Sequence, residues 1–387
     1  MMTVLYILLA IVVLLFMVLV HELGHYIAGK ILKFKITEFS IGFGKAIFSH
    51  TSKKTGEKFS FRLFPLGGYC SFYGEDEDGK GDENSFNNQK PWKRIIVFLA
   101  GVTMNFITAI IFSWILLCTV GYDTPQIIAY SNSINVGQYQ EGDIVTHVNG
   151  TKIDFAFGEN FNMAISNVKT EAKEQYNAYM EENSLTSPLD IPEENYYEFI
   201  MTVKRDGEIK DLTIQVVPYE MDITDSETGE TTKQVVYVIG LESDLTGYPC
   251  TTAYKYGFFE GLGRAFPMAF GFAWVVLKSL WMLITFQIPI TEMGGTITTV
   301  ATMAEFAQQN IANMLVFIPL ISANLAIFNL LPFPALDGAH VLFTVIEWIR
   351  GKPINRKVEN TIHFVGICIL FAFVVIVDIL HLSLIHI

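Results

Sequence analysis

MMTVLYILLAIVVLLFMVLVHELGHYIAGK, residues 1–30, joins a long apolar run to the ionisable side chains of His21, Glu22 and His25. About 20 consecutive apolar residues are enough to cross the hydrocarbon core of a membrane as a helix. The run has no basic residue before it and no small-residue cleavage site, two features of a secretory signal peptide. We therefore predict that residues 1–30 form a retained transmembrane helix with ionisable groups near its end.

The spacing of His21 and His25 indicates a metal site. Residues four apart lie on one face of a helix, so both imidazoles can reach a single ion. Catalytic zinc takes three protein ligands, keeps a fourth position for water and lowers the pKa of that water. Glu22 lies beside the histidines, where its carboxylate can take up the proton. The alternative is a surface helix or two satisfied core histidines, but ionisable groups inside a membrane are costly and usually functional.

Asp337 is the candidate for the third ligand. It is the only acidic residue in the apolar run 314–343, within NLLPFPALDG at 329–338. The two prolines of this stretch interrupt the helical hydrogen bonds and bend the chain. The alternative is that Asp337 caps a helix at the membrane surface. We expect His340 to be a neighbour rather than a ligand, and Asp378 to lie near the outer surface rather than in the site.

The composition is typical of a membrane protein that also has an extramembrane part. Hydrophobic residues make up 51% of the chain and charged residues 17%, and phenylalanine is abundant at 31 copies. The formal net charge of −13 argues against nucleic acid as a partner, because phosphate binding needs a basic surface. The four cysteines form no CxxC pair, so neither a disulfide framework nor a thiolate metal site is expected.

Three further apolar runs, at 95–120, 314–343 and 365–380, are long enough or nearly so to cross a membrane. A fifth run, 266–288, is ambiguous because it contains Lys278 and is followed by a proline. The number of spans therefore has to be decided by charge.

Lysine and arginine placement predicts the topology. Residues 30–94 contain ten lysines and two arginines, and the short loop 350–357 is also basic. The positive-inside rule puts these segments in the cytoplasm, and both termini and residues 122–264 outside. Four spans satisfy this pattern, so we interpret 266–288 as an interfacial or partly inserted helix.

Two regions outside the spans are predicted to contain β-strands. Residues 36–73 hold four short alternating runs separated by glycine-containing turns. Sheet edges that face lipid are not tolerated, so this region is expected to dock within the protein or at the membrane interface. In the polar, acidic region 122–264, the stretch 136–150 closes on Asn149-Gly150 and reads as strand, tight turn and strand. Further strand-like runs follow at 197–204, which ends in a turn at Arg205-Asp206-Gly207, and at 212–217 and 235–241.

These motifs resemble the site-2 protease family of intramembrane metalloproteases. HELGH in the first span and NxxPxPxLDG late in the third carry the resemblance, which extends through FNNQKPWKR (86–94) and AGVTMN (100–105). Residues 137–150 resemble the GL..GD.I..VNG signature of a PDZ domain. Together they resemble the bacterial branch that includes the regulator of sigma-E protease.

The resemblance implies an active site with one zinc ion. It assigns the metal to His21, His25 and Asp337, and it makes Glu22 the catalytic base. It also places Asn324 and Asn329 near the substrate strand.

Three departures from the family pattern stand out. The region outside the membrane holds one PDZ-like domain, as in Gram-positive relatives, where Gram-negative members have two. LDG is followed by Ala339, where members often have glycine. The acidic insertion around 171–194, a helix or a loop, has no assignable role.

A transmembrane substrate must unwind before its carbonyl groups become available. Our hypothesis is that residues 36–73, including Gly67 and Gly68, offer a sheet edge to the extended peptide. Asn324 and Asn329 would donate to the freed carbonyls. The PDZ-like domain would act as a size filter for substrates already trimmed outside the cell, or it would grip a newly exposed C-terminus.

The sequence therefore predicts a polytopic α-helical membrane protein of about four transmembrane helices, with a membrane-associated β region and an extracytoplasmic β-rich PDZ-like domain. The predicted divisions are 1–30 (first span), 31–92 (cytoplasmic-side β region), 93–121 (second span), 122–245 (PDZ-like domain), 246–313 (linker and interfacial amphipathic helix), 314–349 (third span), 350–361 (basic cytoplasmic loop) and 362–387 (fourth span and tail).

The predicted function is that of an intramembrane zinc endopeptidase of the bacterial cell membrane, with its site near the cytoplasmic side. Its substrates would be single-span membrane proteins, by analogy anti-sigma factors or remnant signal peptides, after a first extracytoplasmic cut. One alternative is a catalytically inactive, PDZ-bearing membrane adaptor, which the intact Glu22 disfavours. The other is a divalent-metal transport protein, which the lack of internal repeats disfavours. The sequence does not predict the oligomeric state.

Overall fold

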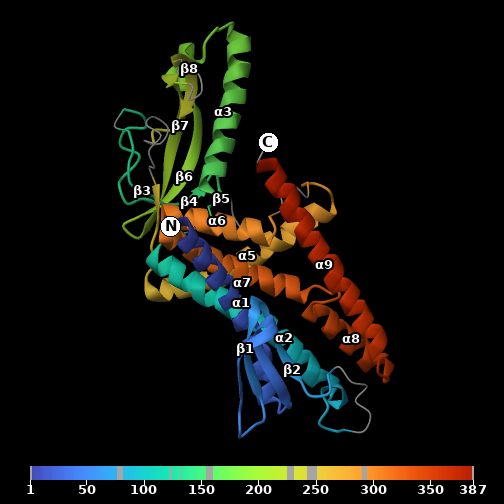
Figure 1. The fold of residues 1–387 in the computed structure, drawn as a ribbon. Helices are drawn as coiled ribbons and strands as arrows, with labels where there is room; N and C mark the ends of the chain where they lie inside the picture. Colours follow the sequence, from blue (N-terminus) through green and yellow to red (C-terminus); the bar gives the residue numbers. More distant parts are fainter. Residues whose placement is uncertain are drawn as a thin grey trace. The chain divides into compact units, whose positions relative to one another are not determined.

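The computed structural model describes residues 2–75, 82–122, 124–131, 133–153, 160–224, 231–241, 251–289 and 294–385. The chain divides into two compact units, whose elements can be followed in Figure 1. Unit 1 comprises Met1–Trp114 with Ala265–Ile387, and unit 2 comprises Ile115–Arg264. Unit 1 carries HELGH and LDG, and unit 2 contains the predicted β-rich domain. The predicted domain boundary at 245/246 lies outside the described residues.

Among the described residues, five helices are long and apolar enough to cross a membrane. They are α1 (Met2–Ile31), α2 (Pro91–Thr119), α5 (Phe258–Ile284), α7 (Met314–Leu330) and α9 (Arg356–Ile385). Four spans are predicted from the sequence, and α5 is the fifth. It buries Met268 and Phe272 but exposes Phe266, Phe270 and Trp274. This one-sided pattern suits an interfacial helix and a span equally, so the interfacial placement stays a prediction.

The structure divides the predicted third span, 314–349, into two helices, at the prolines that are expected to interrupt the helical hydrogen bonds. α7 ends at Leu330, and α8 (Asp337–Arg350) begins after a turn over 331–336. Pro332 and Pro334 have no N–H to donate, so the helical ladder cannot continue through them. The break leaves Asp337 as the first residue of a new helix.

The predicted basic loop 350–361 is also longer than the loop in the structure. α9 already begins at Arg356, directly after the short turn that follows α8. The C-terminal helix therefore starts before the predicted boundary at 362.

Helix α1 is packed closely against three other helices of unit 1. A Cβ at Gly24 would lie 2.8 Å from Met104 Cγ of α2, so only glycine permits this approach. On the other side, Met17 is fully buried with Met303 of α6 (Thr296–Gln309) and Met314 of α7. These contacts fix the helix that carries the two histidines.

Asp378 does not belong to the site and caps a helix. Its carboxylate accepts hydrogen bonds from the N–H groups of Ile297 and Thr298 in the first turn of α6, both at 3.3 Å. A carboxylate at this position satisfies free N–H groups and favours the positive end of the helix. The last helix thereby holds α6 in place.

Strands β1 (Ile36–Thr51) and β2 (Lys58–Phe72) form the sheet of unit 1. Each strand bends, so that two segments of β2 lie on either side of the first part of β1. Phe39, for example, pairs with Cys70 on one side and with Phe59 on the other. The chain changes direction at glycines with positive φ, which are Gly42 (86°), Gly44 (83°) and Gly56 (74°). The four predicted runs are thus confirmed as paired segments, although they join into two bent strands.

Buried polar groups tie this sheet together and to α1. Glu38 accepts hydrogen bonds from Ser60 Oγ at 2.5 Å and from Arg62 Nη2 at 2.7 Å. Burial alone raises the pKa of Glu38, but the hydrogen bonds outweigh it and lower the pKa to about 2. Lys30, at the end of α1, donates to Glu57 Oε1 at 2.5 Å. The sheet is therefore anchored next to the HELGH segment.

Unit 2 is an antiparallel sheet with one long helix. Its strands are β3 (Pro125–Ile127), β4 (Ile144–Val148), β5 (Thr151–Lys152), β6 (Tyr197–Arg205), β7 (Glu208–Thr224), β8 (Thr231–Val238) and β9 (Thr251–Ala253). The sheet order is β8-β7-β6-β4-β3-β9, with β5 paired to β4. α3 (Phe161–Asn183) buries one face, including Ile165 and Tyr176, against the sheet. The first half of the acidic insertion is therefore a helix.

The predicted hairpins of unit 2 are confirmed. Asn149 and Gly150 have φ values of 49° and 75°, and Asp206 and Gly207 have 52° and 88°. Two consecutive positive φ values are the mark of a two-residue hairpin turn, whose twist matches that of the flanking strands. Asn-Gly and Asp-Gly are the sequences that adopt it most easily.

Candidate metal and catalytic centre

Three predicted ligand residues meet inside unit 1. His21 and His25 lie near the end of α1 and are almost fully buried, and Asp337 opens α8. Asp337 Oδ2 lies 3.0 Å from His21 Nε2 and 3.5 Å from His25 Nε2. The two Nε2 atoms are 3.2 Å apart. The turn after α7 therefore brings a carboxylate from far along the chain to the HELGH face of α1.

These three atoms fit a zinc ion. Tetrahedral ligands about 2.0–2.1 Å from zinc lie about 3.4 Å from one another, close to the separations found. His25 Nδ1 donates to the carbonyl oxygen of Val97 at 2.8 Å, so Nε2 keeps a lone pair. Asp337 Oδ2 is buried without a hydrogen-bond donor among the described residues. Two imidazole nitrogens and a carboxylate oxygen that converge in this way are suited to a cation.

Asn105 of α2 supports His21 and was not predicted from the sequence. Its side-chain amide lies 3.2 Å from His21 Nδ1, and the residue is fully buried. An amide can present either its oxygen or its nitrogen to a neighbour. With Oδ1 toward Nδ1, the amide would accept the Nδ1 proton and leave the His21 Nε2 lone pair for the metal. The only signal in the sequence is a polar residue inside an apolar span.

Gly101 makes room for both histidines. A Cβ at this position would lie 2.5 Å from His25 Nε2 and 2.7 Å from His21 Cε1. Helix α2 thus forms one wall of the site, with a glycine where the ligands approach it. The sequence offers no way to recognise this role, because it depends on which helix lies beside α1.

Glu22 lies at the border between the three predicted metal ligands and the sheet. Its half-buried carboxylate interacts with His25, His21 and Asp337 and accepts a hydrogen bond from the Cys70 backbone. A Cβ on Gly68 would lie 3.0 Å from Glu22 Cγ, so β2 passes directly over this residue. The position suits a base that acts on a group held between the metal and β2.

The other predicted site residues, Gly67, Asn324 and Asn329, are less closely associated with His21, Glu22, His25 and Asp337. Gly67 lies beside Gly68 in β2, where a Cβ would collide with the ring of Phe43. Asn324 and Asn329 are half-buried on α7. Five residues correspond to roughly 140° around a helix, so the two amides point in different directions. Within the described ranges, no hydrogen bond joins either amide to the four central residues.

A second cluster, His340, Glu359 and His363, also groups potential ligands. The rings of His340 and His363 are stacked, with centroids 4.0 Å apart and planes 12° from parallel. Imidazole lone pairs lie in the ring plane, so two stacked rings cannot direct them to one ion. By contrast, the rings of His21 and His25 are nearly perpendicular, at 83°. His340 is thus a neighbour of the site rather than a ligand, as predicted.

Comparison with known proteins identifies the family to which this chain belongs. The model of peptidase family M50 matches residues 9–373. A protein of Fusobacterium nucleatum named as a zinc metalloprotease is 28% identical over 380 residues, covering 96% of this chain and 97% of the relative. Relatives with the same kind of name occur in Campylobacter jejuni, at 29% identity over 92% of this chain and 88% of the relative, and in Clostridium perfringens, at 27% identity over 94% of each. The chain belongs to peptidase family M50, the site-2 proteases, and is a zinc metallopeptidase of the membrane.

Proposed function

We propose that this protein is an intramembrane endopeptidase that cleaves the transmembrane segments of single-span membrane proteins. The observation that carries the proposal is the position of the ligands. His21 and His25 lie within an apolar helix long enough to span a membrane, and Asp337 meets them there. A peptidase centre at this depth suits a peptide bond that is itself within the membrane.

Each central residue has a chemical task in this reaction. Zinc, when bound, supplies a Lewis acid that polarises the scissile carbonyl and activates water. The Glu22 carboxylate accepts a proton from the attacking water and passes it to the leaving amine. His21, His25 and Asp337 hold the metal, while Val97 and Asn105 orient the two rings.

The sheet next to Glu22 is the proposed site of substrate binding. The segment around Gly68 and Cys70 pairs with residues 36–41 on one side and touches Glu22 on the other. An unwound substrate that added a strand here would satisfy its backbone groups beside the catalytic base. Asn324 and Asn329 would donate to carbonyl groups that this strand leaves unpaired.

Unit 2 is proposed to be a PDZ-like domain outside the cytoplasm that controls access. It would exclude substrates that still carry a bulky outer domain, so that cleavage follows a first extracytoplasmic cut. Anti-sigma factors and remnant signal peptides are substrate classes of this kind. In this proposal both termini lie outside and the active site lies toward the cytoplasmic side of a bacterial cell membrane. Counting α5 as a fifth span would put the termini on opposite sides.

Two other functions are less well supported. A catalytically inactive adaptor would not need Glu22 beside a complete ligand set. A metal transporter would need a path for the ion, whereas these ligands are buried between α1, α2 and α8.

The Glu22→Gln variant tests the proposed activity. It keeps the size of the side chain but removes the base, so release of cytoplasmic fragments from single-span proteins should fall by about 10²- to 10⁴-fold. Zinc content should stay at the wild-type level, because Glu22 is not a ligand. Glu83→Gln, an exposed carboxylate of the same unit, is the matched control. Equal fragment release by Glu22→Gln and wild type across the membrane proteome would rule out the peptidase activity.

A further inference from the structure

Ala335 is held in a backbone conformation that alanine rarely adopts. Its φ is 91°, in the left-handed region where a Cβ is strained. Asp337 follows two residues later, so this turn sets the direction from which the carboxylate reaches the metal site. A strained conformation persists only where neighbouring groups fix it.

His363 of α9 fixes this turn. The Ala335 N–H donates to His363 Nδ1 at 3.0 Å. One helical turn later, a Cβ at Gly366 would lie 2.5 Å from the carbonyl oxygen of Pro334. Helix α9 therefore holds the turn at two successive points, by a hydrogen bond and by close packing.

The ring of His363 is itself immobilised in a stack. It lies on His340, which in turn lies on Phe98, with centroids 5.0 Å apart and planes 16° from parallel. Since Nδ1 accepts a hydrogen bond, the neutral ring carries its proton on Nε2. That Nε2 is buried without a partner in the described part of the chain. A buried unpaired polar atom is destabilising, so an apolar side chain would pack better here, and the useful atom is Nδ1.

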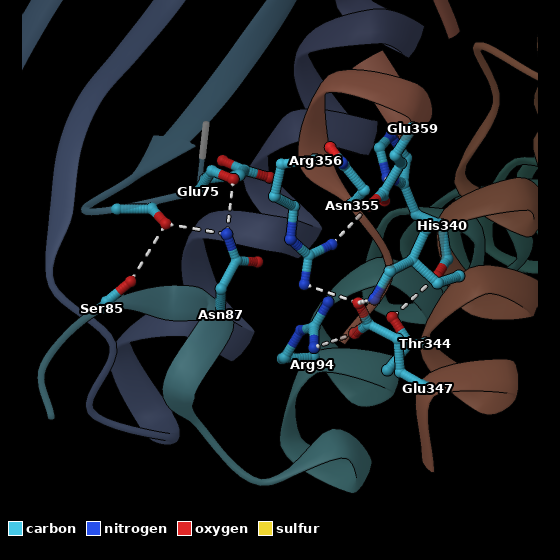
Figure 2. A network of polar contacts seen from close by, with 12 residues as sticks. Glu75, Ser85, Asn87, Arg94, His340, Thr344, Glu347, Asn355, Arg356 and Glu359 are labelled. Atoms are coloured by element: carbon cyan, nitrogen blue, oxygen red, sulfur yellow. Dashed lines mark hydrogen bonds and ion pairs between the residues drawn. The ribbon is translucent and has the colours of Figure 1, made fainter. Parts of the chain in front are cut away.

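Buried charges fix the start of α9 relative to α8. Figure 2 shows Arg356 and Arg94 on either side of Glu347. Arg356 Nη2 and Arg94 Nη1 each lie 2.7 Å from a Glu347 oxygen, and Arg356 also pairs with Glu359. Arg94 belongs to α2 and Glu347 to α8, so three helices meet about two turns before His363. The histidine is thus held at a set distance from the helix that begins with Asp337.

We propose that His363 is a positioning residue for the metal site. Its Nδ1 holds Ala335 in the left-handed conformation and thereby directs the Asp337 carboxylate toward His21 and His25. His363 is not a ligand and does not touch the reacting atoms. The inference rests on the proposed ligation of zinc by Asp337 and deepens it.

Cobalt(II), whose visible absorption reports ligand number and geometry, is the probe for this role. In the purified full-length protein, His363→Leu should bind Co²⁺ roughly 10- to 100-fold more weakly and give an altered visible spectrum. His363→Asn places an acceptor oxygen close to the position of Nδ1, so its affinity and spectrum should be near those of the wild type. Phe343→Leu, which alters a ring beside His363, is the packing control and should leave both unchanged.

A second substitution separates positioning from packing. Glycine adopts positive φ without strain, so Ala335→Gly should restore most of the Co²⁺ affinity lost in His363→Leu. Wild-type affinity in His363→Leu would overturn the proposal. Equal weakening in His363→Asn, with no recovery by Ala335→Gly, would assign His363 to packing alone and also overturn it. Asp337→Ala tests ligation separately: if it kept wild-type affinity, the ligand set itself would be wrong.

Discussion

A single methyl group at position 101 tests how tightly the histidines are confined. In Gly101→Ala the new Cβ would lie 2.5 Å from His25 Nε2, so a ring or α2 has to move. We expect zinc affinity to fall about tenfold or more, as it does when groups that orient ligands are lost. Competition with a chelator, followed by zinc analysis of the purified protein, measures the change.

Gly263→Ala is the matched control for this substitution. Gly263 also lies in a long helix, but nothing is within 4 Å of a Cβ built there. Wild-type zinc affinity in both variants would show that α2 does not confine the ligands.

Some site residues could be predicted from the sequence because their pattern is local. His21 and His25 are four apart, and Asp337 is the only acidic residue of its apolar run. Asn105 and His363 could not be predicted in the same way. Their roles depend on which helices lie beside α1 and the LDG turn, and that information is not contained in helical periodicity.

At the scale of elements, β2 is where substrate binding can be separated from metal binding. Proline at position 68 removes the backbone N–H and adds bulk where even a Cβ would lie only 2.8 Å from Ser40 O. We expect Gly68→Pro to abolish fragment release, and Gly67→Pro to do the same, while zinc content stays normal. Loss of zinc in either variant would show instead that β2 supports the metal site.

Elements are predicted best where turns have strong local chemistry. The changes of direction at Gly42, Gly44 and Gly56 and the Asn149-Gly150 hairpin are confirmed, whereas Gly67 and Gly68, also predicted as a turn, lie within strand β2. The division between α7 and α8 is only partly predictable: the two prolines predict a bend, whereas the chain leaves the helix altogether. The difference arises because Gly338 lets α8 approach the carbonyl oxygens at the end of α7, which favours a compact turn over a kinked helix.

At the scale of the whole molecule, removing unit 2 tests whether it filters or recruits substrates. Strands β3 and β9 are paired, so the chain enters and leaves the sheet of unit 2 at neighbouring positions. The deletion should therefore begin at β3 and end at β9. Tyr254 N–H donates to Thr124 O at 2.9 Å, so residues 125–253 can be replaced by two glycines with little strain. The contact between Thr124 Oγ1 and Tyr256 OH, at 2.6 Å, is retained.

We expect this deletion to permit cleavage of full-length, untrimmed substrates, because a filter has been removed. Fragment release from trimmed and untrimmed versions of one single-span protein measures the effect, with zinc content as the control for folding of unit 1. Slower cleavage of both versions would identify unit 2 as a receptor instead.

The proposed ligands are divided between α1 and α8, with more than 300 residues between His25 and Asp337. During synthesis, the two histidines enter the membrane long before the carboxylate that completes the set. Because three ligands are needed for a stable catalytic zinc site, the metal can be secured only after the segment that carries Asp337 has been made. The nascent chain therefore has no proteolytic activity while it is still in contact with the proteins of the membrane-insertion machinery.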